Sequence, residues 1–397
     1  MFNDSPPIKL TLARDISKHI KRGNPWVFGD VLQDRPKAKS GTLAHLYTGK
    51  NEFLGTGYYC DKINLAFRMV ALEEKKILPG AIKARMERSL NAKRHLYVAG
   101  RQDSFRLFNG EGDSLPGLVC DIYANVAVIK LDGEAANGFW RPQDIAEWLM
   151  TIGLPLKSVY LKRRNNEEEK GQLLIDGGVD LTKVQFHENG ALFETHLIDA
   201  AKTGFFLDQR DNRFLVGQMS DGKTLLNMFG YTGGFSLFAG LGGATHTTTV
   251  DIAPAAIAAA NHNWAINNLP AEKHDGVTAD AFAWLKEQAK LKKQWDFVIT
   301  DPPSFAPNAK AVEAAKSAYI EVFIDSLKLV KLGGLFAASS CSGHISFDLF
   351  LELCQEAISK TRRRGRVLVA RGQPEDHPWP LALEEMRYLK FVLFEVQ

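Results

Sequence analysis

One stretch of the sequence restricts the fold more than any other. An apolar run at 225–229 leads into glycines at positions 230, 233 and 234, and the apolar segment after them leads to a second run that ends in Asp251. A strand, a turn with glycines, a helix and a second strand make half of a doubly wound α/β sheet. In such a sheet the turn lets the backbone approach a ligand, and the acid can bind ribose hydroxyls. The stretch therefore predicts a nucleoside-binding site.

The spacing of the glycines narrows the choice of ligand. The Gly-x-Gly-x-x-Gly pattern of a dinucleotide site is missing, and no Lys-Ser or Lys-Thr pair follows as in a P-loop, so a tightly held pyrophosphate is not indicated. S-adenosylmethionine carries a ribose and an adenine but no phosphate, and it fits the stretch better. A purely structural strand–helix turn is the alternative interpretation of this stretch alone.

From residue 224 onward, predicted strands and helices alternate, as a parallel sheet requires. No long helix separates the last two predicted strands, so we expect the final strand to insert antiparallel. Seven strands with one reversed is the class I methyltransferase sheet, an α/β fold of Rossmann-like order. The strands are expected at 225–229, 246–250, 275–278, 296–300, 335–340, 366–370 and 389–395.

The first half of the chain is organised differently. Residues 1–72 alternate short apolar runs with Gly and Pro, which predicts a small β-barrel. A long helix with one basic face begins near Leu78, and several strands and a further helix follow it. This pattern predicts an α+β middle domain over residues 73–195. Residues 196–397 would then form the methyltransferase domain, so that we expect three domains.

Composition excludes several classes of protein. Hydrophobic residues make up 45% of the 397 residues and charged residues 24%, which is typical of a globular protein. No apolar run approaches the roughly 18 residues that span a bilayer, and the first residues lack the apolar core of a signal peptide. We therefore expect a cytoplasmic protein without a membrane segment. The net charge of +3 is mild, so nucleic-acid binding would depend on local basic patches.

The cysteines bear on metals and on catalysis. The four cysteines, at positions 60, 120, 341 and 354, are too few and too scattered for a disulfide framework or a zinc site. The sequence holds neither Cys-x-x-Cys nor His-Glu-x-x-His. No metal ion is therefore expected, and the question becomes whether one cysteine is a nucleophile.

Three acids and one cysteine follow predicted strands of the sheet, where ligands of such folds bind. These residues are Asp251, Asp280, Asp301 and Cys341. Asp280 is explained equally well as the N-cap of the following helix. The turn formed by Asp301 and the two prolines after it is more specific, because the prolines fix the backbone and leave a rigid, carbonyl-rich loop that can face a flat base.

Cys341 distinguishes between kinds of base methylation. An Asp-Pro-Pro-Tyr loop usually grips an exocyclic amino group, but here the fourth residue is Ser304. C5 of a pyrimidine is not nucleophilic enough to accept a methyl group directly, so an enzyme first adds a nucleophile at C6. A thiol serves well because it is partly ionised near neutral pH. Cys341 is interpreted as this nucleophile, and Cys60, Cys120 and Cys354 as small buried hydrophobic residues.

The chain resembles a known family along nearly its whole length. It is similar to the PUA-containing 23S ribosomal RNA cytosine-C5 methyltransferases, the RlmI type. The run from Thr203 to Arg213 is the most specific of the matching stretches. The full set of matching stretches is 23–28, 110–113, 115–117, 202–213, 229–235, 301–303, 340–343, 376–378 and 388–390.

The resemblance implies a role for each matching residue of the cofactor site. Asp251 would bind the ribose of S-adenosylmethionine and Asp280 its adenine. Asp301 would lie between cofactor and base and hydrogen-bond the N3 side of cytosine, which stabilises the charge built up when Cys341 attacks C6. The base that removes the C5 proton is not identified. The remaining cofactor-binding residues would be Phe206, Gln209, Asn227, Phe229, Gly230, Tyr231, Thr232 and Gly233.

The resemblance also makes the first domain a PUA module for structured RNA, with 23S ribosomal RNA as the partner. The target base must be unstacked to reach Cys341, which favours a loop or partly assembled RNA over an intact duplex. A plain solvated surface is the alternative for the basic helix face, and a homodimer is compatible with the sequence. The candidate phosphate contacts are Lys18, Lys21, Arg22, Lys83, Arg85, Arg88, Lys93 and Arg94.

Two other functions are kept open beside methylation of cytosine C5 in 23S ribosomal RNA. An enzyme of the same class that methylates a guanine or an amino nitrogen would need no thiol, so Cys341→Ala would remain active. A non-catalytic RNA-binding factor of ribosome assembly would have a vestigial cofactor pocket. The acids at 251, 280 and 301, all retained with the turn glycines, argue against this last function.

Overall fold

The structure is a computed structural model that describes residues 1–73, 78–163 and 171–397. The chain divides into two compact units, which are described separately. The first consists of Met1–His187, Thr195–Leu207 and Glu375–Glu384, and the second of Glu188–Glu194, Asp208–Pro374 and Glu385–Gln397. The division into three domains, with boundaries after residues 72 and 195, stays a prediction.

The second unit is built on a seven-stranded sheet, as the sequence predicts. The strands are parallel except for the last, which pairs antiparallel with both of its neighbours. The class I methyltransferase fold, with its reversed final strand, is therefore confirmed. The order across the sheet is β15 (His274–Thr278), β14 (His246–Asp251), β13 (Thr224–Met228), β16 (Trp295–Thr300), β17 (Val330–Ser340), β19 (Lys390–Val396) and β18 (Gly365–Arg371).

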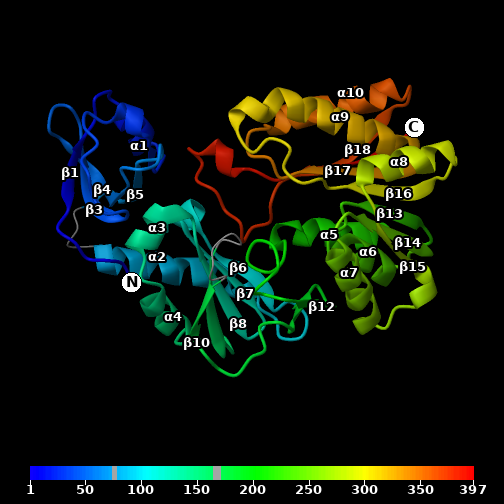
Figure 1. Ribbon diagram of the computed structural model, residues 1–397, viewed down its shortest axis with the longest axis horizontal. Helices are drawn as coiled ribbons and strands as arrows, with labels where there is room; N and C mark the ends of the chain where they lie inside the picture. Colours follow the sequence, from blue (N-terminus) through cyan, green and yellow to red (C-terminus); the bar gives the residue numbers. More distant parts are fainter. Residues whose placement is uncertain (74–77, 164–170) are drawn as a thin grey trace. The chain divides into compact units, whose positions relative to one another are not determined.

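Helices cover both faces of this sheet (Figure 1). Successive strand residues point to opposite faces, so Leu225 joins one buried cluster while Leu226 joins the other, and Phe297 and Val298 divide in the same way. One face is covered by α5 (Arg210–Gln218), α6 (Gly234–Leu241) and α7 (Pro254–Ile266), and the other by α8 (Ala281–Lys290), α9 (Val312–Lys328) and α10 (Phe347–Lys360).

The first unit contains two five-stranded sheets. The first sheet has the order β1 (Ile8–Thr11), β3 (Thr42–Tyr47), β4 (Phe53–Tyr59), β5 (Phe67–Ala71) and β2 (Trp26–Val27), with α1 (Ser17–Lys21) beside it. The second has the order β10 (Gly171–Ile175), β9 (Ser158–Lys162), β8 (Val126–Leu131), β7 (Leu118–Tyr123) and β6 (Ser104–Asn109), with α2 (Leu78–Lys93), α3 (Gly133–Phe139) and α4 (Pro142–Leu149). A two-stranded hairpin, β11 (Val184–Glu188) and β12 (Ala191–Thr195), follows them, and its residues Glu188–Glu194 belong to the second unit.

The segment Glu375–Glu384 returns to the first unit although it lies between the last two strands of the second. Asp376 is fully buried, and its Oδ2 accepts a hydrogen bond of 2.9 Å from the backbone nitrogen of Arg106. Asn109 Nδ2 donates to the carbonyl of Pro378 at 2.8 Å. A Cβ on Gly112 would lie 1.8 Å from that same carbonyl oxygen, so only glycine fits there. The matching stretches at 110–113 and 376–378 thus pack against each other.

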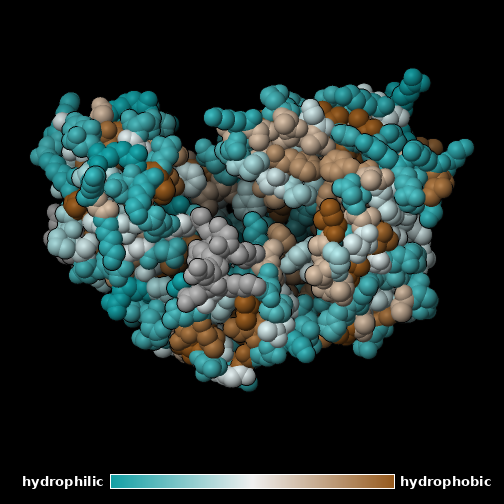
Figure 2. Space-filling model, viewed as in Figure 1, coloured by the Kyte–Doolittle hydropathy of each residue, from teal (hydrophilic) through white to brown (hydrophobic). Residues whose placement is uncertain are grey.

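Among the helices of the described ranges, none has both the length and the hydropathy that crossing a bilayer requires. The face shown in Figure 2 is mostly hydrophilic, and its apolar side chains form separate small patches.

Replacing one partner of the buried ion pair between Glu188 and Arg213 should destabilise the second unit. Arg213 Nε and Nη2 lie 2.6 and 2.7 Å from the two carboxylate oxygens, and both side chains are buried. Arg213→Met would leave a buried carboxylate without its charge partner, so the free energy of unfolding should fall by about 3–5 kcal/mol. Urea denaturation followed by circular dichroism measures this loss.

The exposed pair of Lys286 and Glu321, whose charged atoms are 2.8 Å apart, provides the control. Lys286→Met should change the free energy of unfolding by less than about 1 kcal/mol, because water screens the pair. Equal losses in the two variants would contradict the stabilising role assigned to Arg213.

Candidate active site

The turn between β13 and α6 has the tight backbone that the glycine pattern predicts. Phe229 and Tyr231 have φ angles of 58° and 47°, and Gly233 has 76°. A Cβ on Gly233 would also lie 2.7 Å from the Cβ of Ala260, and one on Gly230 would lie 2.5 Å from a methyl group of Thr249. Both glycines are therefore needed for the turn to pack closely against α7 and β14.

Asp251 and Asp280 lie at the ends of neighbouring strands, as expected. Asp251 Oδ2 accepts a hydrogen bond of 2.9 Å from the backbone nitrogen of Tyr231, and Oδ1 accepts one of 3.0 Å from Ala253. A carboxylate has further acceptor sites, so these bonds leave capacity for ribose hydroxyls. Asp280 Oδ1 accepts from the backbone nitrogen of Ala283 at 2.9 Å and caps α8. The capping role is observed, and binding of adenine stays a prediction.

Three buried oxygen atoms on predicted cofactor residues, or on the residue next to one in sequence, lack hydrogen-bond partners within the described part of the chain. They are Asn227 Oδ1, Thr232 Oγ1 and Asp208 Oδ1. An unsatisfied buried acceptor costs roughly 1–3 kcal/mol and calls for an explanation. The ammonium and hydroxyl groups of S-adenosylmethionine are donors that would satisfy such oxygens, so the residues present fit the predicted cofactor. Asp208 is an addition to the sequence-based list of candidates.

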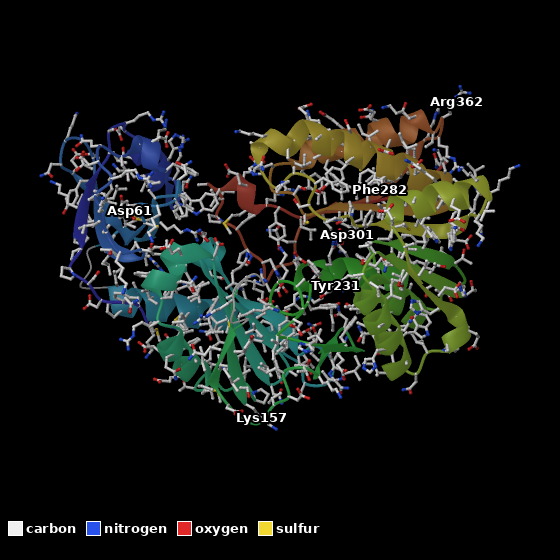
Figure 3. The ribbon with its side chains drawn as sticks, viewed as in Figure 1. Asp61, Lys157, Tyr231, Phe282, Asp301 and Arg362 are labelled. Carbon is white, nitrogen blue, oxygen red and sulfur yellow. The ribbon has the colours of Figure 1, made fainter. Side chains whose placement is uncertain are left out.

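Aromatic rings line the same edge of the sheet. The Phe282 ring, on α8, lies 6.1 Å from that of Phe229 and 6.2 Å from that of Phe305, measured between centroids. Tyr231, Phe282 and Asp301 come from different segments of this unit (Figure 3). Sequence reasoning missed Phe282, although its place two residues after Asp280 was a usable signal. Its ring is a candidate surface for the adenine.

A chain of hydrogen bonds fixes the orientation of Gln209. Arg371, at the end of β18, donates to Asn212 Oδ1 at 2.5 Å, and Asn212 Nδ2 donates to Gln209 Oε1 at 2.5 Å. Gln209 Nε2 then donates to Asp301 Oδ2 and to Ser339 Oγ, each at 2.9 Å. A guanidinium can only donate, so Arg371 sets the direction of every bond in the chain. The amide nitrogen of Gln209 therefore points at Asp301.

Asp301 has a pKa that suits proton exchange near neutrality. Burial raises the pKa of Asp301 to about 6, and the negative charge of Asp208 acts in the same direction. Hydrogen bonds from Ser339 and Gln209 oppose this rise because they favour the ionised form. Strongly shifted carboxylates are concentrated at functional sites, so Asp301 is the strongest candidate for acid–base chemistry in this unit.

Cys341 differs from the other cysteines in its exposure. It is partly exposed just after β17, whereas Cys60, Cys120 and Cys354 are buried. Burial raises the pKa of the Cys120 and Cys354 thiols, which keeps them in the unreactive protonated form. The structure thus favours Cys341 as the reactive thiol.

The loop after β17 is fastened to the Asp-Pro-Pro loop. Ser342 Oγ lies 3.0 Å from Ser304 Oγ and 2.9 Å from the hydroxyl of Tyr319, which also lies 2.8 Å from Ser340 Oγ. Ser342 and Ser340 are fully buried, as is Tyr319. These hydroxyl groups flank Cys341 in sequence, so they hold the candidate nucleophile in a fixed relation to the loop that begins at Asp301.

Not every predicted residue joins this site. Phe206 belongs to the first unit, whereas Gln209 and the other cofactor candidates belong to the second. Phe206 is therefore not part of the site described here, and its contact with the cofactor stays a prediction.

The basic residues of the first unit fall into two groups. Lys93 is buried, and its ammonium lies 2.7 Å from Asp113 Oδ2 and 2.9 Å from the carbonyl of Leu107. Arg85 is half-buried and donates to the carbonyls of Val70 and Ser114. The structure does not support these two as phosphate contacts, because the helix turns them toward the interior. The exposed candidates are Lys18, Lys21, Arg22, Lys83, Arg88 and Arg94.

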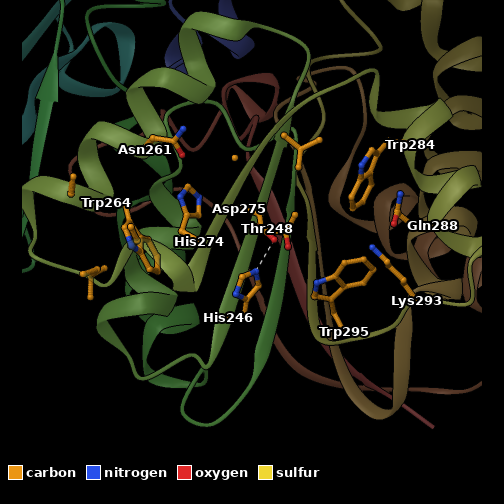
Figure 4. A pocket seen from close by; sticks show the side chains of 15 residues that line it. His246, Thr248, Asn261, Trp264, His274, Asp275, Trp284, Gln288, Lys293 and Trp295 are labelled. Carbon is orange, nitrogen blue, oxygen red and sulfur yellow. Dashed lines mark hydrogen bonds and ion pairs between the residues drawn. The ribbon is translucent and has the colours of Figure 1, made fainter.

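A separate pocket of about 710 Å³ lies along the edge strand β15 (Figure 4). His274 stacks on Trp264 with centroids 4.8 Å apart, and its Nε2 lies 2.8 Å from Thr249 Oγ1. Burial lowers the pKa of His274 to about 4, so the ring is neutral at physiological pH. Trp284 and Trp295 also line the pocket. None of the predicted site residues lines it, and its histidine is explained by packing.

The raised pKa of Asp301 predicts how stability depends on pH. The folded state binds a proton between pH about 4 and 6 that the unfolded state has released, so this carboxyl lowers the free energy of unfolding as pH rises through that window. Asp301→Asn should therefore gain stability relative to wild type between pH 4 and pH 7, by about 2–3 kcal/mol for a shift of roughly two units. Urea denaturation of both proteins at pH 4 and at pH 7 measures this difference in the free energy of unfolding.

Asp296, on the same sheet, is a control of opposite sign. Burial raises its pKa, but hydrogen bonds from Lys331 and Thr224 outweigh this and lower the pKa overall. Its stabilising effect is present at neutral pH and is lost as pH falls, so Asp296→Asn should be more harmful at pH 7 than at pH 4. If the two variants changed in the same direction with pH, the raised pKa of Asp301 would be refuted.

Comparison with known proteins agrees with this geometry. The family model described as S-adenosylmethionine-dependent methyltransferase matches residues 156–365, and the model of a PUA-like domain matches residues 10–71. The second match covers the small sheet at the start of the chain, and the first covers most of the sheet that carries Asp301 and Cys341.

Relatives extend along the whole chain. A ribosomal RNA large subunit methyltransferase of Deinococcus radiodurans is 34% identical over 410 residues, which cover 99% of this chain and 98% of the relative. A ribosomal RNA large subunit methyltransferase I of Alteromonas mediterranea is 31% identical and is covered to 99%, as is this chain.

Solved structures share the fold. A putative methyltransferase complexed with SAH is 25% identical and superposes with a TM-score of 0.86 over 98% of this chain and 100% of the other. A putative methyltransferase from Streptococcus mutans, 24% identical with a TM-score of 0.85, has the same fold. S-adenosylmethionine is thus the cofactor that both the fold and the site indicate. The chain belongs to the S-adenosylmethionine-dependent methyltransferases, and among them to the family of the ribosomal RNA large subunit methyltransferases.

Proposed function

We propose that this enzyme methylates C5 of a cytosine in 23S ribosomal RNA, with Cys341 as the covalent nucleophile. The printed names of the relatives give large-subunit ribosomal RNA as the molecule on which they act. The observation that supports the choice of cytosine C5 is the position of Cys341. It is a partly exposed cysteine after β17, and its neighbour Ser342 is hydrogen-bonded to Ser304 of the Asp-Pro-Pro loop.

The residues present account for the covalent part of the proposed reaction. S-adenosylmethionine supplies the methyl group when it is bound. The Cys341 thiolate forms a bond to C6 of the cytosine, which makes C5 an enamine carbon able to accept that methyl group. Loss of the C5 proton then restores the double bond, and the electron pair of the sulfur–carbon bond returns to Cys341. The free cysteine is regenerated, so the residue acts once in each turnover.

Asp301 is proposed to stabilise the charge that this attack creates on the base. Its pKa of about 6 means that the carboxyl exchanges a proton readily near neutral pH, so it can hydrogen-bond the N3 side of cytosine in either protonation state. Gln209 Nε2 and the Ser339 hydroxyl both hydrogen-bond this carboxyl, which fixes the carboxyl plane before the base arrives. A group oriented in advance stabilises developing charge without further reorganisation.

The cofactor is proposed to lie along the carboxyl ends of β13, β14 and β15. Asp251 would bind the ribose, and Asp280 with the neighbouring Phe282 would hold the adenine. The turn from Phe229 to Gly233 would lie against the methionine end. Asn227, Thr232 and Asp208 each have a buried oxygen without a partner in the described ranges, so donors of the bound cofactor would satisfy them.

The RNA is proposed to contact exposed basic residues of the first unit, in the cytoplasm. Lys18 and Lys21 lie on α1, beside the PUA-like sheet, and Arg22 follows α1 directly. Lys83 and Arg88 lie on α2, and Arg94 follows α2 directly. Such contacts bind phosphate irrespective of sequence. The target base would then be selected by Cys341 and by the rigid Asp-Pro-Pro loop that begins at Asp301. Both would act on a base that has been taken out of its stack.

Cys341→Ala should abolish methyl transfer to unmodified 23S RNA while leaving binding of S-adenosylmethionine intact. The expected loss is to background, because no other described thiol is exposed to replace the nucleophile. Transfer from labelled S-adenosylmethionine is followed, and the product base is identified by nuclease digestion and mass spectrometry. Calorimetry with S-adenosylmethionine shows that the variant is folded.

Cys354→Ala is the matched control, since this cysteine is buried in α10 and should not affect the chemistry. A Cys341→Ala variant as active as wild type would transfer the assignment to methylation of a guanine or amino nitrogen. Failure of the wild-type protein to bind S-adenosylmethionine would instead favour a non-catalytic assembly factor.

Neutralising the exposed basic residues of α2 and of the turn that follows it should weaken RNA binding in a salt-dependent way. The triple variant Lys83→Gln, Arg88→Gln and Arg94→Gln removes up to three cations that can neutralise phosphates. The slope of log affinity against log salt concentration should become shallower by about one for each phosphate that is no longer neutralised. Filter binding over a range of salt concentrations measures the slope, with Lys286→Gln as an exposed control on α8. An unchanged slope would show that α2 presents an ordinary solvated face.

A further inference from the structure

Lys390 is a fully buried lysine directly beside the candidate nucleophile. It is the first residue of β19, and its backbone pairs with Ser340, the residue before Cys341. Its ammonium donates to the carbonyl of Ser342, the residue after Cys341, and at 2.7 Å to the carbonyl of Tyr388. The side chain therefore reaches the short loop that carries the thiol from the neighbouring strand.

The charge of this lysine has no acidic partner in the described part of the chain. No carboxylate of those ranges forms an ion pair with Lys390, and both of its hydrogen bonds go to neutral carbonyl groups. Burying an unpaired ammonium is costly, because the charge loses its hydration. Burial accordingly lowers the pKa of Lys390 to about 8, while a charge on Cys341 would raise it again. The group whose ionisation stabilises this lysine is thus the thiol.

We propose that Lys390 is a positioning residue for Cys341, which stabilises the thiolate as its counter-ion and fixes the loop through the carbonyl of Ser342. This inference deepens the proposed function and rests on it, since the covalent route needs a thiolate. The thiol proton leaves to solvent while Lys390 remains protonated. When the sulfur–carbon bond to C6 breaks at the end of the cycle, the electron pair that returns to sulfur faces the same ammonium.

Other titratable groups near the thiol act less directly. The Arg387 guanidinium lies on the ring of Phe347, 4.9 Å from its centroid, and is exposed. Tyr319, on α9, has a raised pKa because it is buried, so it stays neutral. His344 follows in the same loop, and the backbone of Glu385 lies 3.1 Å from where a Cβ on Gly343 would be; the side chains of His344 and Glu385 are exposed. Lys390 is the buried cation of this set.

The reactivity of Cys341 toward iodoacetamide tests the proposal without RNA or cofactor. The full-length protein is alkylated at a series of pH values, and the peptide that contains Cys341 is quantified by mass spectrometry. The midpoint of the rate–pH profile reports where the thiolate forms. In wild type this midpoint should lie at least one pH unit below that of an ordinary cysteine, which is about 8.5.

Two neutral variants remove the charge in different ways. Lys390→Met also removes the bond to the carbonyl of Ser342, whereas Lys390→Gln can keep one donor there. Both should raise the midpoint by about one unit or more, and alkylation at pH 7 should slow about threefold, because the thiolate becomes scarcer but intrinsically more nucleophilic. Lys390→Arg, which keeps the charge, should restore part of the shift.

Lys162 of the first unit offers a close control. It is also buried, donates to the carbonyls of Leu197 and Ala200, and has a pKa lowered by burial to about 8. Lys162→Met removes a lysine of the same kind from a different place, so it should leave the midpoint of Cys341 unchanged. If Lys162→Met raised the midpoint of Cys341 by the same amount, the shift would reflect a general destabilisation of the fold, and the proposal would be overturned.

The remaining outcomes are equally decisive. If the wild-type midpoint lies at or above 8.5, the usual thiol value, Lys390 does not stabilise a thiolate, and this result needs no variant. If Lys390→Gln is folded and has the wild-type midpoint, the proposal fails as well. Because alkylation requires no methyl transfer, these results stand apart from the Cys341→Ala experiment, which alone judges the nucleophile.

Discussion

The register of the last strand determines the geometry of the candidate site. β19 lies between β17 and β18, with Lys390 opposite Ser340 on one side and Phe391 opposite Arg371 on the other. The first pairing places a buried ammonium beside the cysteine loop, and the second places the guanidinium that orients Gln209. A slip by one residue would turn every side chain of the strand to the opposite face. The pairing of β19 with its two neighbours therefore positions both Lys390, beside the cysteine loop, and Arg371, which orients Gln209.

Two ionisable groups near the candidate site have pKa values shifted toward neutrality. Asp301 has a pKa raised to about 6 and Lys390 one lowered to about 8, in each case chiefly by burial. Shifted pKa values alone do not identify catalysis. Lys162 of the first unit and His274, which lines the pocket along β15, also have shifted pKa values, and neither lies among the predicted site residues. Position decides: Asp301 begins the Asp-Pro-Pro loop, and Lys390 reaches the loop of Cys341.

The sequence was sufficient to predict the sheet but only part of the site. Each of the seven strands overlaps its predicted range, because strand-length apolar runs and short turns are local signals. The acids and Cys341 were found because strand ends of parallel sheets meet at one edge. Lys390 was recognised only as part of a motif, since its role depends on the neighbour it acquires across the sheet. The hydrogen bond from Arg371 to Asn212 joins residues that are 159 positions apart in the sequence, so no local signal predicts it.

The difference between local sequence signals and contacts made in the folded protein also explains which lysines and arginines of α2 are exposed. A count of basic residues predicted one continuous charged face, but the helical register turns Lys93 onto the side of Met86 and Leu90, where it meets Asp113. Arg85 is drawn inward by backbone carbonyls in a similar way. Composition along a helix indicates which charges exist, whereas the packing of the neighbouring strands decides which of them reach solvent.

The interior position of β19 also has a consequence for biosynthesis. This strand comes after all the others in the sequence, yet β17 and β18 cannot be joined without it. While the chain is being synthesised, Cys341 leaves the ribosome about fifty residues before Lys390. Domains generally fold as units, so the sheet can close only after β19 has been made. During that interval the thiol has neither its neighbouring strand nor its cation. With the role proposed for Lys390, the cation that stabilises the thiolate would therefore reach Cys341 only when the sheet closes.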